Sequence, residues 1–398
     1  MKKRRVKITG IGIVSPAGIG KNEFEKNIIS GNGFVRPITR FPKEGGEFVA
    51  SEVKGFEPQA FFKETKLPRH TQFALAATEL ALEDAGLKKL GIQSLSPIVI
   101  TGTSLMDSEV INQTITNVEK KGPRYALARV VFQGPVSSVS STVARTLGGA
   151  RTLTVQTACC SGLDAIGHGA NIVSAGEADI AICGGTEAPI FYHPMLELKS
   201  AGLSPSTSDR YNELCRPFDL WRTTGVIGEG ACICIIEPEV SVRKGYAFIE
   251  GYGYSTDVDN FHGKGLSHAM ELCLANAGVK AFEVDAVNAW GPGHKEVDAM
   301  ESRALYDVFE GRVKCMPTVS IKGAIGNPFA AAGALQVGSA VLGLRGNYIP
   351  PTVNWSCMDP ECDLALSSCV RYFRHDITLV NSHGVSGTNA CLLLKRCE

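Results

Sequence analysis

Short runs of β-branched residues alternate with longer stretches of small residues along the chain, and this alternation most constrains its fold. Segment 5–14 has the composition of a strand, whereas 70–86 repeats apolar residues at helical spacing and ends at Gly86, a typical helix C-cap. The alternation predicts an α/β protein. Further strands are expected at 96–104, 152–157, 178–185, 246–253, 284–290, 316–321, 377–384 and 388–395, and further helices at 160–176, 266–278 and 329–344.

The alternation occurs twice, with a break at 237–244. A chain of 398 residues is long enough for two domains or for one fold made of two similar halves. We therefore divide it into an N-terminal half, 1–240, and a C-terminal half, 241–398. The last two predicted strands are expected to form a closing hairpin.

Composition excludes several classes of function. The 40 basic and 40 acidic side chains balance, which argues against broad nucleic-acid binding. No segment approaches the ~18 consecutive apolar residues of a membrane helix. The basic residues at 2–5 precede a predicted strand and not the apolar stretch of a signal peptide. Thirteen cysteines without a small-scaffold pattern indicate reduced thiols, so we expect a cytoplasmic protein without membrane or nucleic-acid partners.

Metal and cofactor motifs are weak. Cys357, Cys362, Cys369 and His375 lie close in sequence but lack the paired CxxC spacing of zinc sites. No phosphate loop, HExxH or GxSxG motif occurs. The sequence therefore predicts no metal and no redox or nucleotide cofactor.

Cys159 lies where the strand 152–157 meets the helix 160–176. A thiol at a helix N-terminus is near unpaired N–H groups and the positive end of the helix dipole. Both lower the pKa of a thiol and favour the nucleophilic thiolate. The alternative is a buried structural thiol, and the residues alone leave both interpretations open.

The segment TACCSG at 157–162 is similar to the nucleophile motif of the β-ketoacyl-acyl carrier protein synthases, type I/II ketosynthases of the thiolase superfamily. Other segments resemble the same family in order along nearly the whole chain: 5–18, 120–131, 216–219, 228–231, 287–291, 320–327 and 381–389. The resemblance implies a thiolase-like five-layer αβαβα fold of two pseudo-duplicated halves. It also implies a homodimer, with the acyl channel near the dimer interface.

By the same resemblance, Cys159 accepts an acyl group from an acyl carrier protein, and the carrier supplies the phosphopantetheine. The family's two active-site histidines align with Trp290 and Asn327. An indole N–H and an amide NH₂ can donate hydrogen bonds, but neither residue is a base near neutral pH. Losing an oxyanion donor typically costs ~10²–10³ in rate. The resemblance therefore implies a retained nucleophile with atypical or absent malonyl decarboxylation.

Two further features follow from the alignment with the family. Lys322 lies five residues before Asn327, and the family pairs this lysine with the glutamate at Glu301, so we expect a structural Lys322–Glu301 ion pair. Gly225 replaces a large gating ring, and Val385 replaces the phenylalanine whose backbone N–H helps form the oxyanion hole.

His383 also replaces a phenylalanine of the family's C-terminal loop, one residue before Gly384. It is a candidate for the missing base. The alternative is a packed imidazole bonded to backbone.

Basic residues suggest where an acidic carrier protein would dock, although ordinary solvated charge is the alternative. By resemblance they surround the pocket mouth: Lys63, Lys66, Arg69, Lys120, Lys121, Arg124 and Arg210.

Two other functions remain open at this point. The chain can be a non-catalytic partner, like a chain-length factor, in a heterodimer with an active ketosynthase. Such partners usually lose the nucleophile, so Cys159 weighs against this. It can also be a hydrolase of acyl thioesters.

Overall fold

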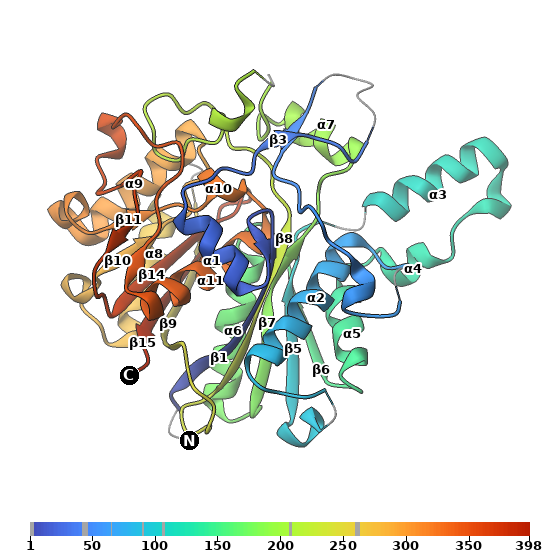
Figure 1. The fold of residues 1–398 in the computed structure, drawn as a ribbon, viewed down its shortest axis with the longest axis horizontal. Coiled ribbons are helices and arrows are strands. Elements are labelled where there is room, and N and C mark those ends of the chain that lie inside the picture. Colours follow the sequence, from blue (N-terminus) through green and yellow to red (C-terminus); the bar gives the residue numbers. More distant parts are fainter. Residues whose placement is uncertain are drawn as a thin grey trace.

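The computed structural model describes residues 4–41, 47–64, 66–89, 91–105, 108–206, 209–258 and 263–398. Within these ranges, eleven strands form one continuous sheet that runs through the whole molecule (Figure 1). The sheet order is β11-β10-β14-β15-β9-β1-β8-β7-β5-β6, and β2 pairs with β1 beside this path. Strands from the two halves of the chain therefore occupy opposite ends of the sheet.

The N-terminal half contributes β1 (Val6–Ser15), β5 (Pro97–Gly102), β6 (Arg151–Val155), β7 (Ile180–Glu187) and β8 (Gly230–Pro238). β5 runs parallel to both β6 and β7, and β8 is antiparallel to both β7 and β1. These five strands lie in the sheet in the order β1-β8-β7-β5-β6. Numbered by their order along the chain, that is first, fifth, fourth, second and third.

The C-terminal half repeats this order. Its strands are β9 (Ala247–Thr256), β10 (Ala286–Asn288), β11 (Thr318–Val319), β14 (Ile377–His383) and β15 (Thr388–Arg396). β10 is parallel to both β11 and β14, and β15 is antiparallel to both β14 and β9. The halves are thus topological copies, joined where β1 pairs with β9. The closing hairpin is confirmed as β14–β15.

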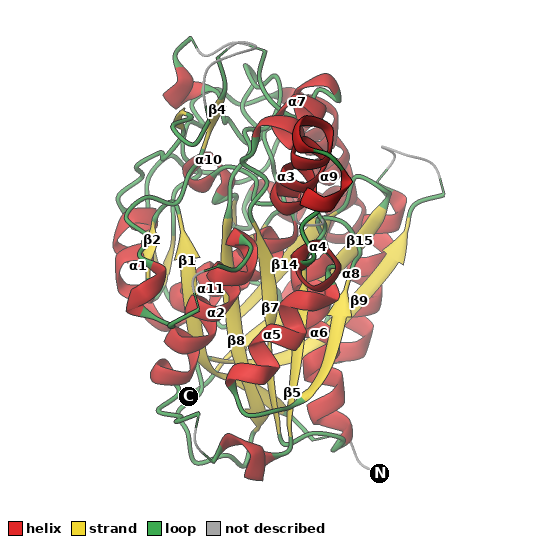
Figure 2. Cartoon of the chain, turned by 90° about the vertical axis from the view of Figure 1, so that its right-hand side faces the viewer, coloured by secondary structure: helices red, strands yellow, loops and turns green. Residues whose placement is uncertain are grey.

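The longest helices form three layers around the two halves of the sheet. α2 (Arg69–Asp84) and α5 (Ser137–Thr146) pack on strands of the first half, and α8 (Lys264–Ala277) packs on the second half with α9 (Lys295–Phe309) against it. α6 (Ser161–Ala175) and α11 (Ala330–Gly346) contact strands of both halves. The predicted five-layer thiolase-like fold is therefore confirmed; its layers lie side by side in Figure 1, and Figure 2 views them from the side of α2 and α5.

Side-chain alternation along the strands fills the three hydrophobic cores. On β15, Leu392 and Leu394 face the central core with α6 and α11, whereas Cys391 and Leu393 face the core beneath α8. α11 is buried on every side from Ala330 to Leu344, as expected of a helix that lies between the two halves of the sheet.

The remaining elements lie at the edges and over the top of the sheet. α3 (Ser108–Lys121) and α4 (Arg129–Gln133) project from the body (Figure 1). The others are β2 (Gly18–Ile19), α1 (Lys21–Ile29), β3 (Arg36–Pro37), β4 (Val49–Ala50), α7 (Tyr192–Ser200), α10 (Lys322–Ile325), β12 (Tyr348–Ile349) and β13 (Arg371–Tyr372).

Two predicted strands are shorter than expected. The strand predicted at 284–290 ends at Asn288, and the one predicted at 316–321 is reduced to Thr318–Val319. The chain leaves the sheet at these points to build the walls of a cavity, so the apolar pattern extends beyond the hydrogen-bonded strand. None of the described helices is long and apolar enough to cross a membrane.

Gly12 on β1 provides a test of the packing between this strand and α2. A Cβ atom at Gly12 would lie 1.9 Å from the backbone oxygen of Ala77, whereas one at Gly311 would meet nothing within 4 Å. We expect Gly12→Ala to lower the free energy of unfolding by about 3 kcal/mol, because backbone cannot yield as a flexible side chain can. Gly311→Ala should change it by less than about 0.5 kcal/mol. Urea denaturation of both variants checks this, and equal stabilities would contradict it.

Candidate active site

Cys159 lies in a strained turn between β6 and α6. Ala158 has a φ of +51°, in the left-handed region that alanine rarely adopts. The Ser161 hydroxyl stabilises the turn, accepting from the Thr157 N–H at 2.9 Å and donating to the Ala158 oxygen at 2.5 Å. Cys160 is the N-cap of α6, so the preceding Cys159 is held at the amino end of that helix.

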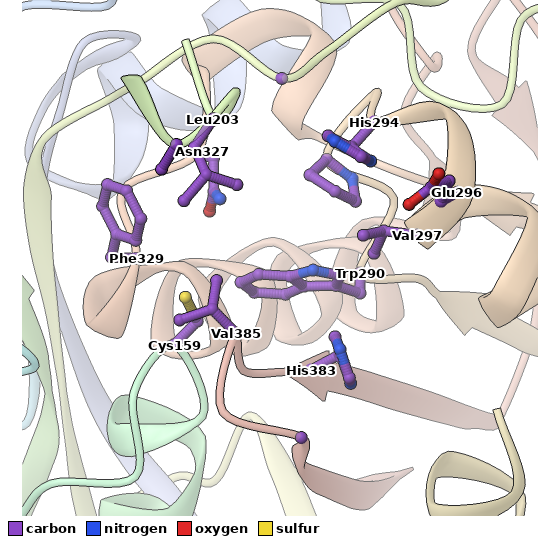
Figure 3. A pocket seen from close by; sticks show the side chains of 14 residues that line it. Cys159, Leu203, Trp290, His294, Glu296, Val297, Asn327, Phe329, His383 and Val385 are labelled. Atoms are coloured by element: carbon purple, nitrogen blue, oxygen red, sulfur yellow. The ribbon is translucent and has the colours of Figure 1, made fainter. Parts of the chain in front are cut away.

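The turn places Cys159 at the wall of a cavity of about 330 Å³. The four predicted catalytic residues, from four separate parts of the chain, all line it (Figure 3): Cys159, Trp290, Asn327 and His383. Gly225 and Val385 also line this cavity. The structure therefore brings the predicted nucleophile, donors and gate residues to one place.

Burial controls the protonation of Cys159, whose exposure is 2%. Burial raises the pKa of the Cys159 thiol to about 12, although hydrogen bonds from the Val385 N–H and its own N–H act in the opposite direction. The expected thiolate is therefore wrong for the unoccupied site, because desolvation outweighs the stabilising groups. At neutral pH the nucleophile rests as a thiol.

The two N–H groups around the sulfur form a candidate oxyanion hole. Gly384 positions the one from Val385: its N–H bonds the Thr388 oxygen at 2.8 Å, and a Cβ there would lie 2.3 Å from Thr388 Oγ1. The carbonyl oxygen of a thioester on Cys159 lies one carbon atom away from the sulfur, so donors around the sulfur are placed to reach it.

Trp290 and Asn327 present unpaired polar groups at the cavity. The indole N–H of Trp290 bonds no residue of the described ranges, and the side-chain oxygen of Asn327 is buried without a partner. Buried polar groups are costly when unpaired. A bound substrate with complementary groups would satisfy both.

The expected ion pair between Lys322 and Glu301 is wrong. Lys322 Nζ donates to the Trp290 oxygen at 2.5 Å and to Gln336 at 3.0 Å. Glu301 accepts from the N–H groups of Trp290 at 2.8 Å and Gly291 at 2.7 Å. Lys322 and Glu301 instead bind opposite sides of the backbone segment that contains Trp290 and Gly291. They do so because the peptide groups of this segment have no strand partners beyond Asn288.

Burial also shifts the titration of this pair. It lowers the pKa of Lys322 to about 7 against the raising effect of Glu301, and it raises the pKa of Glu301 against the hydrogen bonds from backbone. Lys322 Nζ lies 3.7 Å from the centre of the Trp290 ring, a cation–π contact that fixes the indole.

His383 is buried, and its Nδ1 lies 2.8 Å from Asn389 Oδ1. Its partner is thus a side chain and not the backbone of the alternative interpretation. The ring borders the cavity with Cys159.

One predicted docking residue is structural. Arg69 donates to both oxygens of the fully buried Glu229, at 2.9 and 2.6 Å, and also to the Val53 oxygen. A buried carboxylate needs such a paired cation, so Arg69 is committed to the interior. The other six basic residues are exposed and none lines the cavity: Lys63, Lys66, Lys120, Lys121, Arg124 and Arg210.

Glu296 and Phe329 line the cavity but were missed by the sequence analysis. Glu296 lies two residues after His294, and Phe329 lies two residues after Asn327, and neither position carries a motif signal. No group of described residues is arranged to hold a metal ion, and all thirteen cysteines are free thiols.

The raised pKa of Cys159 predicts how its alkylation depends on pH. We expect the rate with iodoacetamide to rise about tenfold per pH unit from about pH 7 to pH 9, because only the thiolate reacts and its fraction grows below the pKa. Mass spectrometry of the peptide that contains Cys159, with Cys159→Ala as the reference for labelling at Cys160, measures this rate. A rate already constant near pH 7 would show a thiolate and contradict the prediction.

Two family models cover most of the chain: "Beta-ketoacyl synthase, N-terminal domain" matches residues 3–240, and "Beta-ketoacyl synthase, C-terminal domain" matches residues 241–356. The sequence is 31% identical to 3-oxoacyl-[acyl-carrier-protein] synthase 2 of Coxiella burnetii, over 100% of this chain and 99% of that protein. It is 30% identical to putative polyketide beta-ketoacyl synthase 1 of Streptomyces cyaneus, over 98% of each chain.

Solved structures agree with the sequence relatives. The ishigamide ketosynthase/chain length factor superposes with a TM-score of 0.92 at 31% identity, over all of both chains. A type II polyketide synthase ketosynthase, solved with its acyl-carrier protein, superposes with a TM-score of 0.90 at 26% identity, also over all of both chains.

Proposed function

Since the chain belongs to the β-ketoacyl synthase family of fatty-acid and type II polyketide synthesis, we propose that it transfers an acyl group from an acyl carrier protein onto Cys159. The observation that carries this proposal is the position of the Cys159 sulfur in the cavity wall, with two backbone N–H groups directed at it. These groups match the needs of acyl transfer, in which negative charge develops on a carbonyl oxygen next to the nucleophile.

In the proposed transfer, Cys159 attacks the carrier thioester. The new S–C bond forms as the bond to the phosphopantetheine sulfur breaks, and the thiol proton leaves with the carrier thiol. Because the pKa of Cys159 is about 12, the proton must leave during the attack rather than before it. The carbonyl oxygen takes its hydrogen bonds from Cys159 and Val385.

The second half-reaction is where the site departs from a two-histidine ketosynthase. Trp290 and Asn327 offer donors to a malonyl-derived enolate oxygen but no base. We propose that any decarboxylative condensation relies on these two donors and is therefore slow.

Partners are proposed from the surface. Carrier proteins are acidic, and Lys63, Lys66, Lys120, Lys121, Arg124 and Arg210 are exposed to meet them. A second chain, either identical or another ketosynthase, would cover the projecting part of the protein that α3 and α4 form. Val131 and Phe132 on α4 are 72% and 77% exposed, and β6 is an edge strand of the sheet.

A chain-length-factor-like role is the second candidate, since one structural relative is a ketosynthase/chain length factor. The intact nucleophile turn at Cys159 favours a catalytic chain over this alternative.

The first test of the proposal is the intact mass of the protein after incubation with acyl-carrier protein. We expect wild type to gain the mass of one acyl group and Cys159→Ala to gain none, because no other cysteine lines the cavity. Cys315→Ala, which removes an exposed thiol, serves as the matched control and should acylate as wild type does. An adduct that persists in Cys159→Ala, or none from any donor in wild type, would refute the acyltransferase and favour the non-catalytic partner.

A second test addresses Asn327. We expect Asn327→Leu to slow carbon dioxide release from malonyl-carrier by about 10²-fold, because one oxyanion donor is lost, while acylation of Cys159 stays within a few-fold. The same replacement at Asn171, on the exposed face of α6, is the control. Equal rates of carbon dioxide release in both variants would show that Asn327 does not serve this step.

A further inference from the structure

His383 has a fixed tautomer when neutral. It pairs with Asn389 across the β14–β15 hairpin, and its Nδ1 lies 2.8 Å from Asn389 Oδ1. The Asn389 amide nitrogen donates to the Gly387 oxygen at 3.1 Å, so the amide oxygen faces the imidazole. The shared proton must then sit on Nδ1, which leaves the lone pair of the neutral ring on Nε2.

A buried carboxylate lies behind the same nitrogen. Asp257 Oδ2 is 3.9 Å from His383 Nδ1, the Asp257 side chain is 1% exposed, and this oxygen has no hydrogen-bond partner. Its other oxygen accepts from the Gly265 N–H at 2.7 Å, an approach that requires glycine because a Cβ there would lie 2.2 Å from Oδ1. An unpaired buried carboxylate favours a positive charge nearby, so Asp257 stabilises the protonated imidazole.

We propose that His383 is the general base for the acceptor that discharges the acyl group from Cys159, with Asn389 and Asp257 as positioning residues. This inference rests on the proposed acylation of Cys159. Neutral His383 cannot donate from Nε2, so it does not replace the enolate donors of a two-histidine site. It can take a proton, and a carbanion formed by decarboxylation has no proton to give.

The acceptor is therefore a protic nucleophile: water, a hydroxyl or an amine. As its oxygen or nitrogen bonds the acyl carbon, its proton passes to His383 Nε2. The C–S bond to Cys159 then breaks, and the Cys159 thiolate takes the proton back from the imidazolium. The site returns to its starting state with the ester, amide or acid as product. Cys159 and Val385 supply the N–H groups that bond the oxyanion in this step as well.

The test separates discharge from loading. Wild type is acylated with hexanoyl-N-acetylcysteamine, freed of donor, and followed by intact mass in buffer alone, with added ethanol, and with added ethanolamine. We expect His383→Phe, which restores the family's aromatic residue, to slow discharge by about 10²-fold or more. This applies to each of the three conditions in which wild type discharges its acyl group. The rate at which hydroxylamine discharges the acyl group should differ only a few-fold between His383→Phe and wild type, because hydroxylamine attacks thioesters without a base. This result would show that the acyl group remains accessible in the variant. His268→Phe, at a histidine 60% exposed on α8, is the control and should match wild type.

A charge-removing variant of Asp257 adds a readout that a merely structural role would not change. Asp257→Asn keeps the shape of the side chain but removes the negative charge 3.9 Å from the imidazole. We expect it to slow discharge by the acceptors that wild type uses, because the step places a positive charge on the imidazole beside Asp257. Acylation of Cys159 and discharge by hydroxylamine should change only a few-fold.

Two results would overturn the inference alone: discharge of His383→Phe at the wild-type rate, or acyl-Cys159 that is discharged only by malonyl-carrier with release of carbon dioxide. Failure of wild type to form any Cys159 adduct would overturn the proposed function as well.

Discussion

The close approach of α6, α11 and β7 is the contact on which the site depends. A Cβ at Gly162 would lie 2.2 Å from the Ala330 oxygen, and one at Gly185 would lie 2.3 Å from the same atom. Only glycine permits this spacing. Because Cys159 lies two residues before α6 and Asn327 lies three residues before α11, the distance between the helices sets the distance across the cavity. The catalytic geometry is therefore a consequence of how the core packs.

Two buried charged residues stabilise the cavity wall that contains Trp290. The segment that carries Trp290 has left the sheet, and Lys322 and Glu301 bind its carbonyl and N–H groups in place of strand partners. Two buried ions are costly, and each is retained only because it satisfies several polar groups. The residue that this arrangement positions is an indole, which can donate a hydrogen bond but cannot act as a base.

The sequence predicted the fold class, the hairpin and the residues of the cavity because these depend on strand–helix periodicity and on motifs that resemble a known family. It failed where the outcome depends on burial in three dimensions. The thiolate favoured at Cys159 rested on the helix N-terminus, whereas the Lys322–Glu301 pair and the docking role of Arg69 rested on the resemblance to the family. In the structure, desolvation of the sulfur raises the pKa of Cys159. Lys322 and Glu301 bind peptide groups near Trp290 that lack strand partners. Arg69 pairs with the buried carboxylate of Glu229. Asp257 was overlooked, because its relation to His383 exists only after the hairpin forms.

The repeated strand order means that α6 and α11 are equivalent helices of the two copies. Each begins after a residue forced to positive φ, Ala158 at +51° and Phe329 at +43°. Cys159 and Phe329, at these two turns, line the same cavity. Two helix dipoles thus converge on one space with their positive ends. The repeated topology therefore gives the cavity an electrostatic bias toward anions that resides in the backbone and does not depend on which side chains line it.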